Sequence, residues 1–179
     1  MSKKIYLLLT RTGTRFSSMI YRATGYEYTH ASIALDKDLK ELYSFGRRNM
    51  MLPFIAGFVR EDLNSGVYKK YDNTKCVIYE LDVTEETYEN IKKLINVFEE
   101  HKHTYKYNFI GLPLILFNIP YKRERHFVCS QFVAYVLLES GAAELDKEFT
   151  MVKPRDFLNI VNKRLIYNGF LRQYTYPVL

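Results

Sequence analysis

An unbroken apolar run of strand length, Lys4–Thr10, restricts the folding of this chain most, because such a run is typical of a strand buried within a sheet. Further strands are predicted at Tyr28–Leu35, Glu41–Phe45, Cys76–Val83 and Leu165–Tyr174. The residues Asp36–Asp38 supply the turn of a hairpin between two of these strands. We expect a long, partly ordered excursion at Arg47–Lys70, because its proline and glycines interrupt the pattern.

Two segments with apolar residues at helical spacing predict the longest helices. One follows Thr84, a suitable N-cap, and its stripe consists of Tyr88, Ile91, Leu94, Ile95 and Phe98. The other is Phe127–Ser140, ended by Gly141. Shorter helices are expected at Thr14–Thr24 and from Pro154 to Val161. Because strands and helices are segregated in a mixed order, the predicted class is α+β, and 179 residues fit one domain, 1–179.

The net charge and the cysteine content indicate which binding partners and which cellular compartment suit the protein. A net charge of +6 suits anionic partners, or it marks an ordinary solvated basic surface. The apolar run Ile5–Leu9 is too short for a signal peptide, and no stretch reaches the length of a membrane span, so we expect a cytoplasmic protein with reduced thiols. The two cysteines are too few for a disulfide framework or a cysteine-rich zinc site, and neither a metal nor a cofactor is expected.

Cys129 is the candidate nucleophile. It lies at the start of the helix predicted at Phe127–Ser140, on the apolar stripe that continues through Phe132 and Val133. Free backbone N–H groups and the positive end of the helix dipole stabilise a thiolate at this position, which is what a thiol nucleophile needs. The alternative is a buried structural cysteine, and Cys76, which opens an apolar run, is interpreted in that way.

His30 is the candidate base. It lies within the second predicted strand, and a strand gives a base a rigid mount. If Leu35 pairs with Leu39 in the hairpin, His30 lies opposite Ser44, whose hydroxyl can accept a hydrogen bond from one ring nitrogen and fix the tautomer. Glu41 is the alternative carboxylate partner.

The sequence leaves a structural role open for each of the four histidines. A histidine on a strand can simply be a satisfied polar group of the core, and this alternative applies to His30. His101 and His103 follow a long predicted helix, where cations suit the dipole. His126 precedes Cys129 by three residues and is interpreted as part of the helix start or as facing solvent, although it could reach the thiol if the chain turns between them.

The segments around Cys129 and His30 resemble those of NlpC-type cysteine peptidases. Tyr28–Leu35, Tyr-Thr-His-Ala-Ser-Ile-Ala-Leu, resembles the histidine strand of that family, and Phe127–Ala134, Phe-Val-Cys-Ser-Gln-Phe-Val-Ala, resembles its nucleophile helix. The histidine precedes the cysteine here, as in the circularly permuted branch that includes YiiX-like proteins and the lecithin retinol acyltransferase-like enzymes. The resemblance covers Ile5–Phe45 and Tyr105–Leu138, a little under half of the chain.

This resemblance implies a permuted papain-like fold, with a mostly antiparallel sheet packed against helices and the start of the nucleophile helix at the sheet. It implies Cys129 as nucleophile, His30 as base, Ser44 at the third catalytic position and the backbone N–H of Cys129 as an oxyanion donor. Two features depart from the family: the Gly-Asp pair often found before the first strand of YiiX-like proteins is absent, and Ser44 stands at the third position, where relatives often carry histidine, glutamate or another polar group.

The implied function is a thiol hydrolase or acyltransferase that cleaves an amide or ester bond. A lipid-acyl or other small-molecule substrate and a peptide-like one both remain open, and the sequence predicts no oligomeric state. The alternative is a non-catalytic module of the same fold that binds a ligand or a membrane.

The apolar segment Tyr105–Pro120 is a candidate groove wall or lid. Because basic residues follow it directly, we expect that it can rest on an anionic membrane surface. The alternative is a core helix followed by an exposed charged loop. A nucleic-acid partner is not expected, since no stacking motif or nucleic-acid module accompanies the basic run.

Overall fold

A computed structural model describes residues 2–49, 52 and 54–175 of the chain. Its strands are β1 (Ser2–Arg11), β2 (His30–Ala34), β3 (Leu42–Arg47), β4 (Ala56–Glu61), β5 (Lys75–Thr84), β6 (Lys106–Tyr107), β7 (His126–Phe127) and β8 (Lys163–Phe170). Its α-helices are α1 (Arg15–Thr24), α2 (Gly66–Lys70), α3 (Glu85–Glu100), α4 (Gly111–Leu116) and α5 (Cys129–Ser140). Short 3₁₀ turns are η1 (Phe149–Met151), η2 (Pro154–Asn159) and η3 (Leu171–Gln173).

The strands form one eight-stranded sheet in the order β7-β6-β4-β3-β2-β1-β5-β8. Neighbouring strands run antiparallel, except that β6 and β7 run parallel, so the protein belongs to the α+β class with a mixed sheet. The prediction of a buried strand at Lys4–Thr10 is confirmed, since Leu7, Leu8 and Leu9 of β1 are fully buried.

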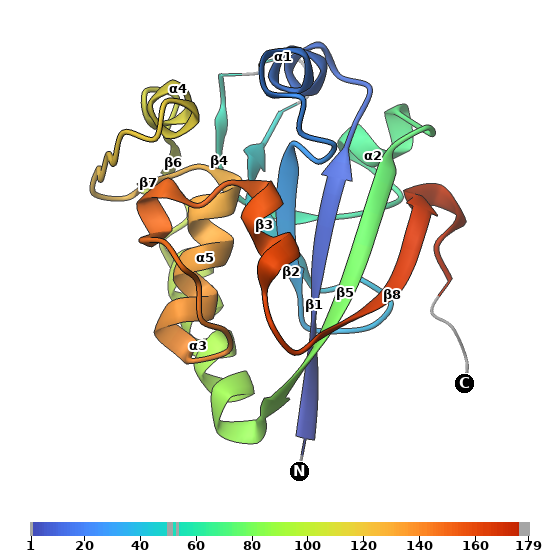
Figure 1. Cartoon of the computed structure of the whole chain (residues 1–179), viewed down its shortest axis with the longest axis vertical. Helices are drawn as coiled ribbons and strands as arrows, with labels where there is room; N and C mark the ends of the chain where they lie inside the picture. Colours follow the sequence, from blue (N-terminus) through green and yellow to red (C-terminus); the bar gives the residue numbers. More distant parts are fainter. Residues whose placement is uncertain (1, 50–51, 53, 176–179) are drawn as a thin grey trace.

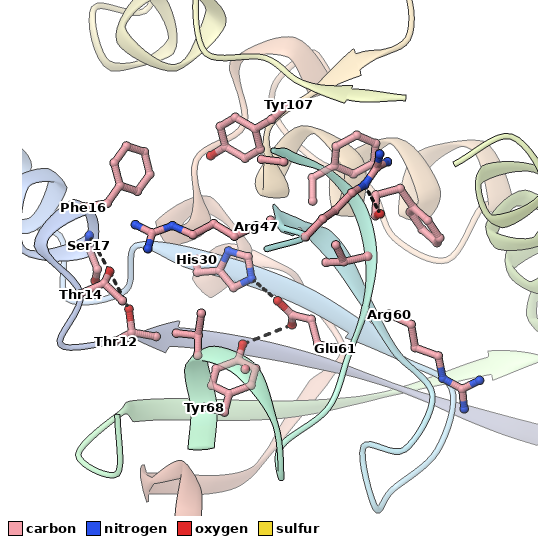
Figure 2. Close-up of a pocket in the computed structure, with 18 of the residues that line it drawn as sticks. Thr12, Thr14, Phe16, Ser17, His30, Arg47, Arg60, Glu61, Tyr68 and Tyr107 are labelled. Atoms are coloured by element: carbon pink, nitrogen blue, oxygen red, sulfur yellow. Dashed lines mark hydrogen bonds and ion pairs between the residues drawn. The ribbon is translucent and has the colours of Figure 1, made fainter. Parts of the chain in front are cut away.

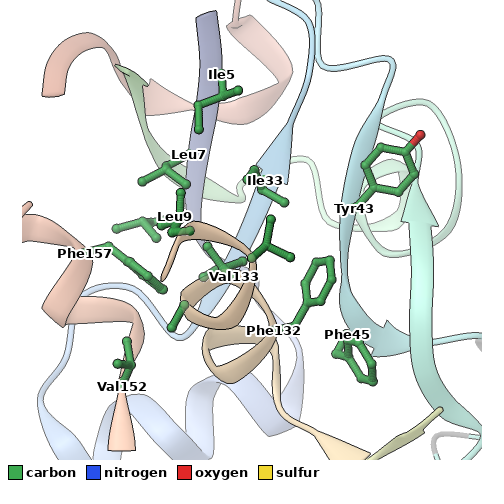
Figure 3. Packing of buried hydrophobic residues seen from close by; sticks show 14 of the residues in the cluster. Ile5, Leu7, Leu9, Ile33, Tyr43, Phe45, Phe132, Val133, Val152 and Phe157 are labelled. Carbon is green, nitrogen blue, oxygen red and sulfur yellow. The ribbon is translucent and has the colours of Figure 1, made fainter. Parts of the chain in front are cut away.

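Helices α3 and α5 pack on one face of the sheet, as Figure 1 shows, while α1 and α4 lie at the same end of the molecule. Side chains of β1 alternate between the two faces: Ile5, Leu7 and Leu9 join the larger core under the helices, and Tyr6 and Leu8 join a smaller cluster on the opposite face. Figure 3 shows the larger core at the point where the strands meet α5.

A cluster of aromatic rings fixes the helices on the sheet. The ring of Phe98 in α3 lies 5.9 Å from that of Phe45 in β3 and 5.0 Å from that of Phe132 in α5, measured between centroids. It also lies 5.8 Å from the ring of Phe58 in β4 and 4.5 Å from that of Tyr105. Since such edge-on and offset contacts are directional, the cluster sets the position of α5 along the sheet as well as its distance from it.

The structure corrects several predicted boundaries. The segment Arg47–Lys70, expected to be a long and partly ordered excursion, contains the strand β4 and the helix α2, neither of which was predicted. The strand was missed because Gly57 interrupts its apolar pattern; a Cβ at this position would meet the Tyr105 carbonyl oxygen at 2.5 Å, so the neighbouring β6 can approach only a glycine.

The ends of the last elements also differ from the prediction. Phe127 belongs to β7, and the helix begins at Cys129. The segment from Pro154 is a 3₁₀ turn that ends at Asn159, and the final strand gives way to η3 at Leu171. Among the helices of the described residues, none has the length and apolar content to cross a membrane.

Replacing Phe98 with alanine should destabilise the fold by about 3–5 kcal/mol, because it removes a buried ring from the centre of the aromatic cluster. Urea unfolding followed by circular dichroism measures this change. Phe117→Ala is the control: its side chain is 76% exposed, so a change within about 0.5 kcal/mol is expected. A loss below about 1 kcal/mol for Phe98→Ala would show that the cluster does not anchor the helices.

Candidate active site

Cys129 is the first residue of α5, and its side chain is 5% exposed. The start of this helix is held by its next two side chains. Ser130 donates a hydrogen bond to the Val152 carbonyl oxygen at 2.6 Å. The side chain of Gln131 accepts one from the Val128 backbone N–H at 3.0 Å and donates one to the Thr150 carbonyl oxygen at 3.0 Å. The sulfur is therefore mounted on a fixed helix end whose first N–H groups have no partner within the helix.

His30 is the first residue of β2 and pairs with Thr10 of β1. The structure brings it next to Cys129, because the two side chains interact closely enough to raise the pKa of the imidazole and lower that of the thiol, and the backbone of Ala31 also lowers the pKa of the thiol. The Nε2 atom of His30 lies 2.8 Å from Oε1 of Glu61 at the end of β4. Thiol, imidazole and carboxylate therefore form a continuous line of polar groups.

The carboxylate of Glu61 is held on both of its oxygens. His30 and Ser44 donate to Oε1, each at 2.8 Å. Ser32 donates to Oε2 at 2.6 Å, and the Tyr68 hydroxyl at 3.2 Å. The side chain of Glu61 is only 13% exposed. Hydrogen bonds from two strands and a helix thus satisfy a largely buried charge and fix the direction in which it faces His30.

The electrostatics of the three groups favour a thiolate and an imidazolium. Burial opposes the charged form of His30, but the charges of Glu61 and Cys129 outweigh it and raise its pKa well above 6.5. Burial likewise opposes ionisation of Cys129, yet the imidazolium and backbone hydrogen bonds from Ala31 and Ser130 lower its pKa below 9.0. Burial also works against the charge of Glu61, and His30, with the hydroxyls of Ser32 and Ser44, keeps its pKa below the ordinary value.

Ser44 lies at this site in a different role from the one predicted. Its hydroxyl donates to Glu61, and Glu61 is the group that His30 contacts through Nε2. The predicted pairing of Leu35 with Leu39 is wrong, because the Leu35 N–H bonds to the Glu41 carbonyl oxygen at 3.1 Å.

The reason is a longer turn than expected. The carboxylate of Asp36 accepts hydrogen bonds from the N–H groups of Asp38, Lys40 and Glu41 and so organises it. Since the register shifts by two residues, an even number, Ser44 stays on the same face as His30. Glu41 lies at the turn end of the hairpin, roughly 16 Å along the strand from His30 at about 3.3 Å per residue, so it is not the orienting carboxylate.

The other histidines have surroundings of their own. His101 follows the end of α3, and Nδ1 of His126 lies 2.7 Å from the Glu124 carbonyl oxygen. His103 lines the same cavity as His30. Cys76 is fully buried in the smaller core cluster, and burial raises its pKa to about 12, as expected for a structural thiol.

A cavity of about 820 Å³ opens beside His30 and Glu61. Its walls are mixed in character. Apolar side chains come from α1, the segment before β4 and the segment before α4: Phe16, Ile20, Phe54 and Phe109. Polar and charged groups occupy the floor, where Figure 2 shows His30, Glu61 and Tyr68 in contact and the Tyr107 hydroxyl directed into the open space.

Tyr107 belongs to the site although the sequence did not single it out. It pairs with Phe127 of β7, which ends two residues before Cys129. Its side chain is 8% exposed. Burial and the neighbouring Cys129 thiolate raise its pKa well above 10, although the positive charge of Arg47 opposes this, so the hydroxyl keeps its proton. It can therefore act as a neutral hydrogen-bond donor close to the sulfur.

Glu61 is the other functional residue that sequence reasoning missed. It lies in the segment Arg47–Lys70, for which no strand was predicted, and only the pairing of β4 with β3 places it at His30. No group of three or more His, Cys, Asp or Glu side chains within the described residues is arranged to hold a metal ion. Comparisons with protein-family models, curated proteins and solved structures give no match for this chain.

Iodoacetamide near pH 7 should alkylate Cys129 at least about tenfold faster than Cys76, since the two thiols have pKa values shifted in opposite directions. Peptide mass spectrometry of a time course measures both rates in one sample. Slow and equal alkylation of the two thiols would contradict an activated Cys129.

Replacing Glu61 with glutamine should move the midpoint of the pH–alkylation curve of Cys129 upward, toward 9.0. The carboxylate keeps His30 protonated, and without it the thiolate loses its counter-charge at lower pH. Glu41→Gln removes the carboxylate that lies away from the site and should leave the midpoint unchanged. Equal midpoints in Glu61→Gln and the parent protein would exclude this role for Glu61.

Proposed function

We propose that this protein is a cysteine-dependent hydrolase or acyltransferase that cleaves an amide or ester bond. The observation that carries the proposal is the line Cys129–His30–Glu61, in which a thiol at a helix start meets a strand histidine held by a buried carboxylate. Nucleophile, base and orienting group are the three parts that nucleophilic acyl transfer requires.

In the first step, the Cys129 thiolate attacks the carbonyl carbon of the substrate, and the carbonyl oxygen becomes an oxyanion. His30 then gives its proton to the leaving nitrogen or oxygen as the carbon–heteroatom bond breaks, which leaves an acyl-thioester on Cys129. Because Glu61 is ionised and accepts only, the proton on Nε2 stays directed toward it. The other ring nitrogen, Nδ1, is then the one that serves the sulfur and the leaving group.

Two donors suit the oxyanion. One is the backbone N–H of Cys129 at the start of α5, where the helix dipole adds positive potential. The other is the Tyr107 hydroxyl, which points into the cavity and keeps its proton. A tyrosine on β6 beside the strand that leads into the nucleophile helix supports this assignment.

The second step regenerates the thiol. Neutral His30 removes a proton from water or from an acceptor alcohol or amine, whose oxygen or nitrogen attacks the thioester carbon. The carbon–sulfur bond breaks, and the protonated His30 again forms an ion pair with the Cys129 thiolate. Water yields hydrolysis and another nucleophile yields transfer, so both reactions use the same groups.

The cavity supports a lipid-acyl or peptide-like substrate. Its apolar wall of phenylalanine and isoleucine side chains can cover an acyl chain or a large side chain, and about 820 Å³ accommodates either. A permuted papain-like architecture is consistent with these features, because a mostly antiparallel sheet packs against the helix that begins at Cys129, with the histidine strand earlier in the chain.

Thiol-directed acyl probes of varied chain length should label the parent protein at Cys129 and should not label Cys129→Ala. Tyr107→Phe should lower the rate of acylation about 10²-fold, because it removes an oxyanion donor, while the rate of alkylation by iodoacetamide, which forms no oxyanion, stays within about threefold. Stopped-flow and gel-based labelling measure the two rates. Labelling that is identical in Cys129→Ala and the parent would favour the alternative, a non-catalytic module that binds the acyl group.

The side chains at the rim of the cavity support an anionic membrane surface as a binding partner. Large apolar side chains stand exposed around the segments next to α4 and before β4: Phe54 is 83% exposed, Phe117 76% and Ile110 54%. The ring centroids of Phe54 and Phe109 lie 6.3 Å apart, so the two segments form one surface. Exposed Lys122 and Arg123 follow α4 in the chain. Apolar side chains with flanking cations are typical of peripheral membrane contact.

Liposomes with phosphatidylserine should carry the protein upward in a flotation gradient, and neutral liposomes should carry less. Charge reversal at Lys122 and Arg123, or serine at both Phe54 and Phe117, should reduce flotation at least about fivefold. Val161→Ser is the matched control, since this side chain is 78% exposed but precedes β8. Flotation that is insensitive to lipid charge and to every variant would exclude this surface.

A further inference from the structure

Arg47 is the last residue of β3 and lines the cavity together with His30, Glu61 and Tyr107. In Figure 2 its side chain extends into the cavity, past His30 and toward Phe16 on α1. It is partly buried. Its position on a strand that also carries Ser44 gives the guanidinium a rigid base close to the catalytic groups.

The guanidinium of Arg47 forms no hydrogen bond or ion pair with any residue that the structure describes. The two other arginines of the cavity lining differ from it in this respect. Arg48 donates to the carbonyl oxygens of Phe58 at 3.2 Å and Tyr105 at 2.9 Å, and Arg60 donates twice to that of Lys40, at 3.1 and 3.3 Å. Arg47 is thus a cation with unused donors, directed into the space where substrate binds.

The carboxylate closest to the chemistry cannot neutralise Arg47. All four donors around Glu61 come from His30, Ser32, Ser44 and Tyr68, and its charge is balanced by His30. A partly desolvated guanidinium with five free donors is a strong binder of carboxylate and phosphate, because its planar fork matches two of their oxygens at once.

We infer that Arg47 binds an oxyanion group of the substrate, a carboxylate or a phosphate, and so selects acyl compounds that carry a negative charge near the scissile bond. This inference rests on the proposed reaction at Cys129 and adds the substrate class to it. The apolar wall then covers the acyl or side-chain part of the substrate, and Arg47 fixes its charged end.

Reaction of Cys129 with N-substituted maleimides tests the inference. One series carries a terminal carboxylate on one to five methylene groups, a second carries a phosphonate, and a third carries the neutral carboxamide. At one chain length or more, the parent protein should react about tenfold faster with an anionic probe than with its neutral counterpart. Comparison of the carboxylate and phosphonate series shows which of the two groups the site prefers.

In Arg47→Gln, the ratio of anionic to neutral rates should fall about tenfold, and Arg47→Lys should restore part of it. Arg60→Gln is the matched control, because this arginine is bonded to Lys40 and points away from His30 in Figure 2; it should keep the parent ratio. An unchanged ratio in Arg47→Gln, with Cys129 still reactive toward neutral probes, would overturn the inference and leave the proposed reaction standing.

A second measurement does not use the thiol. Isothermal titration calorimetry measures the affinity of Cys129→Ala for glutarate and for inorganic phosphate. Adding Arg47→Gln should weaken this affinity at least about fivefold, and adding Arg60→Gln should leave it unchanged. Equal affinities in all three backgrounds would overturn the inference even where Cys129 proves unreactive. Inertness of Cys129 toward all maleimides would separately contradict the proposed reaction.

Discussion

The site depends on the hydrogen bonds that hold the buried carboxylate of Glu61. An ionised group with 13% of its side chain exposed is stable only because four donors satisfy it, and these donors come from β2, β3 and α2. The same hydrogen bonds determine the direction of the charge, so His30 is held as an imidazolium facing Cys129. Loss of one donor would leave part of the hydrogen-bonding capacity of this buried carboxylate unsatisfied, and this links the packing of the sheet directly to the state of the thiol.

The aromatic cluster determines where α5, and with it the sulfur of Cys129, lies relative to the sheet. Phe98 joins α3 to β3, β4 and α5, and the 3₁₀ segment around Thr150 receives the hydrogen bonds of Ser130 and Gln131. Apolar packing therefore sets how far α5 lies from the sheet, while polar contacts set where it begins. Both are needed to hold the sulfur of Cys129 next to the imidazole of His30.

The cavity combines an apolar wall with a polar and charged floor. Its apolar side chains lie on segments that also present exposed phenylalanines to the surface, and its polar floor includes His30 and Glu61. A charged guanidinium at Arg47 lies between these two regions. Such an arrangement fits the substrate proposed above, which has an apolar part and an anionic end.

The sequence by itself determined the α+β class, the buried strand at Lys4–Thr10 and the long helices, because these follow from local periodicity. Helix-end chemistry made Cys129 a candidate nucleophile, and the resemblance to NlpC-type peptidases implied His30 as its base. The third group and the cavity were decided only by the tertiary structure. Glu61 follows His30 by 31 residues and belongs to a strand whose pattern Gly57 interrupts. The hairpin register also depended on side-chain bonds of Asp36, which periodicity does not encode. Long-range strand pairing brings these residues together, and a local pattern carries no information about which strands become neighbours.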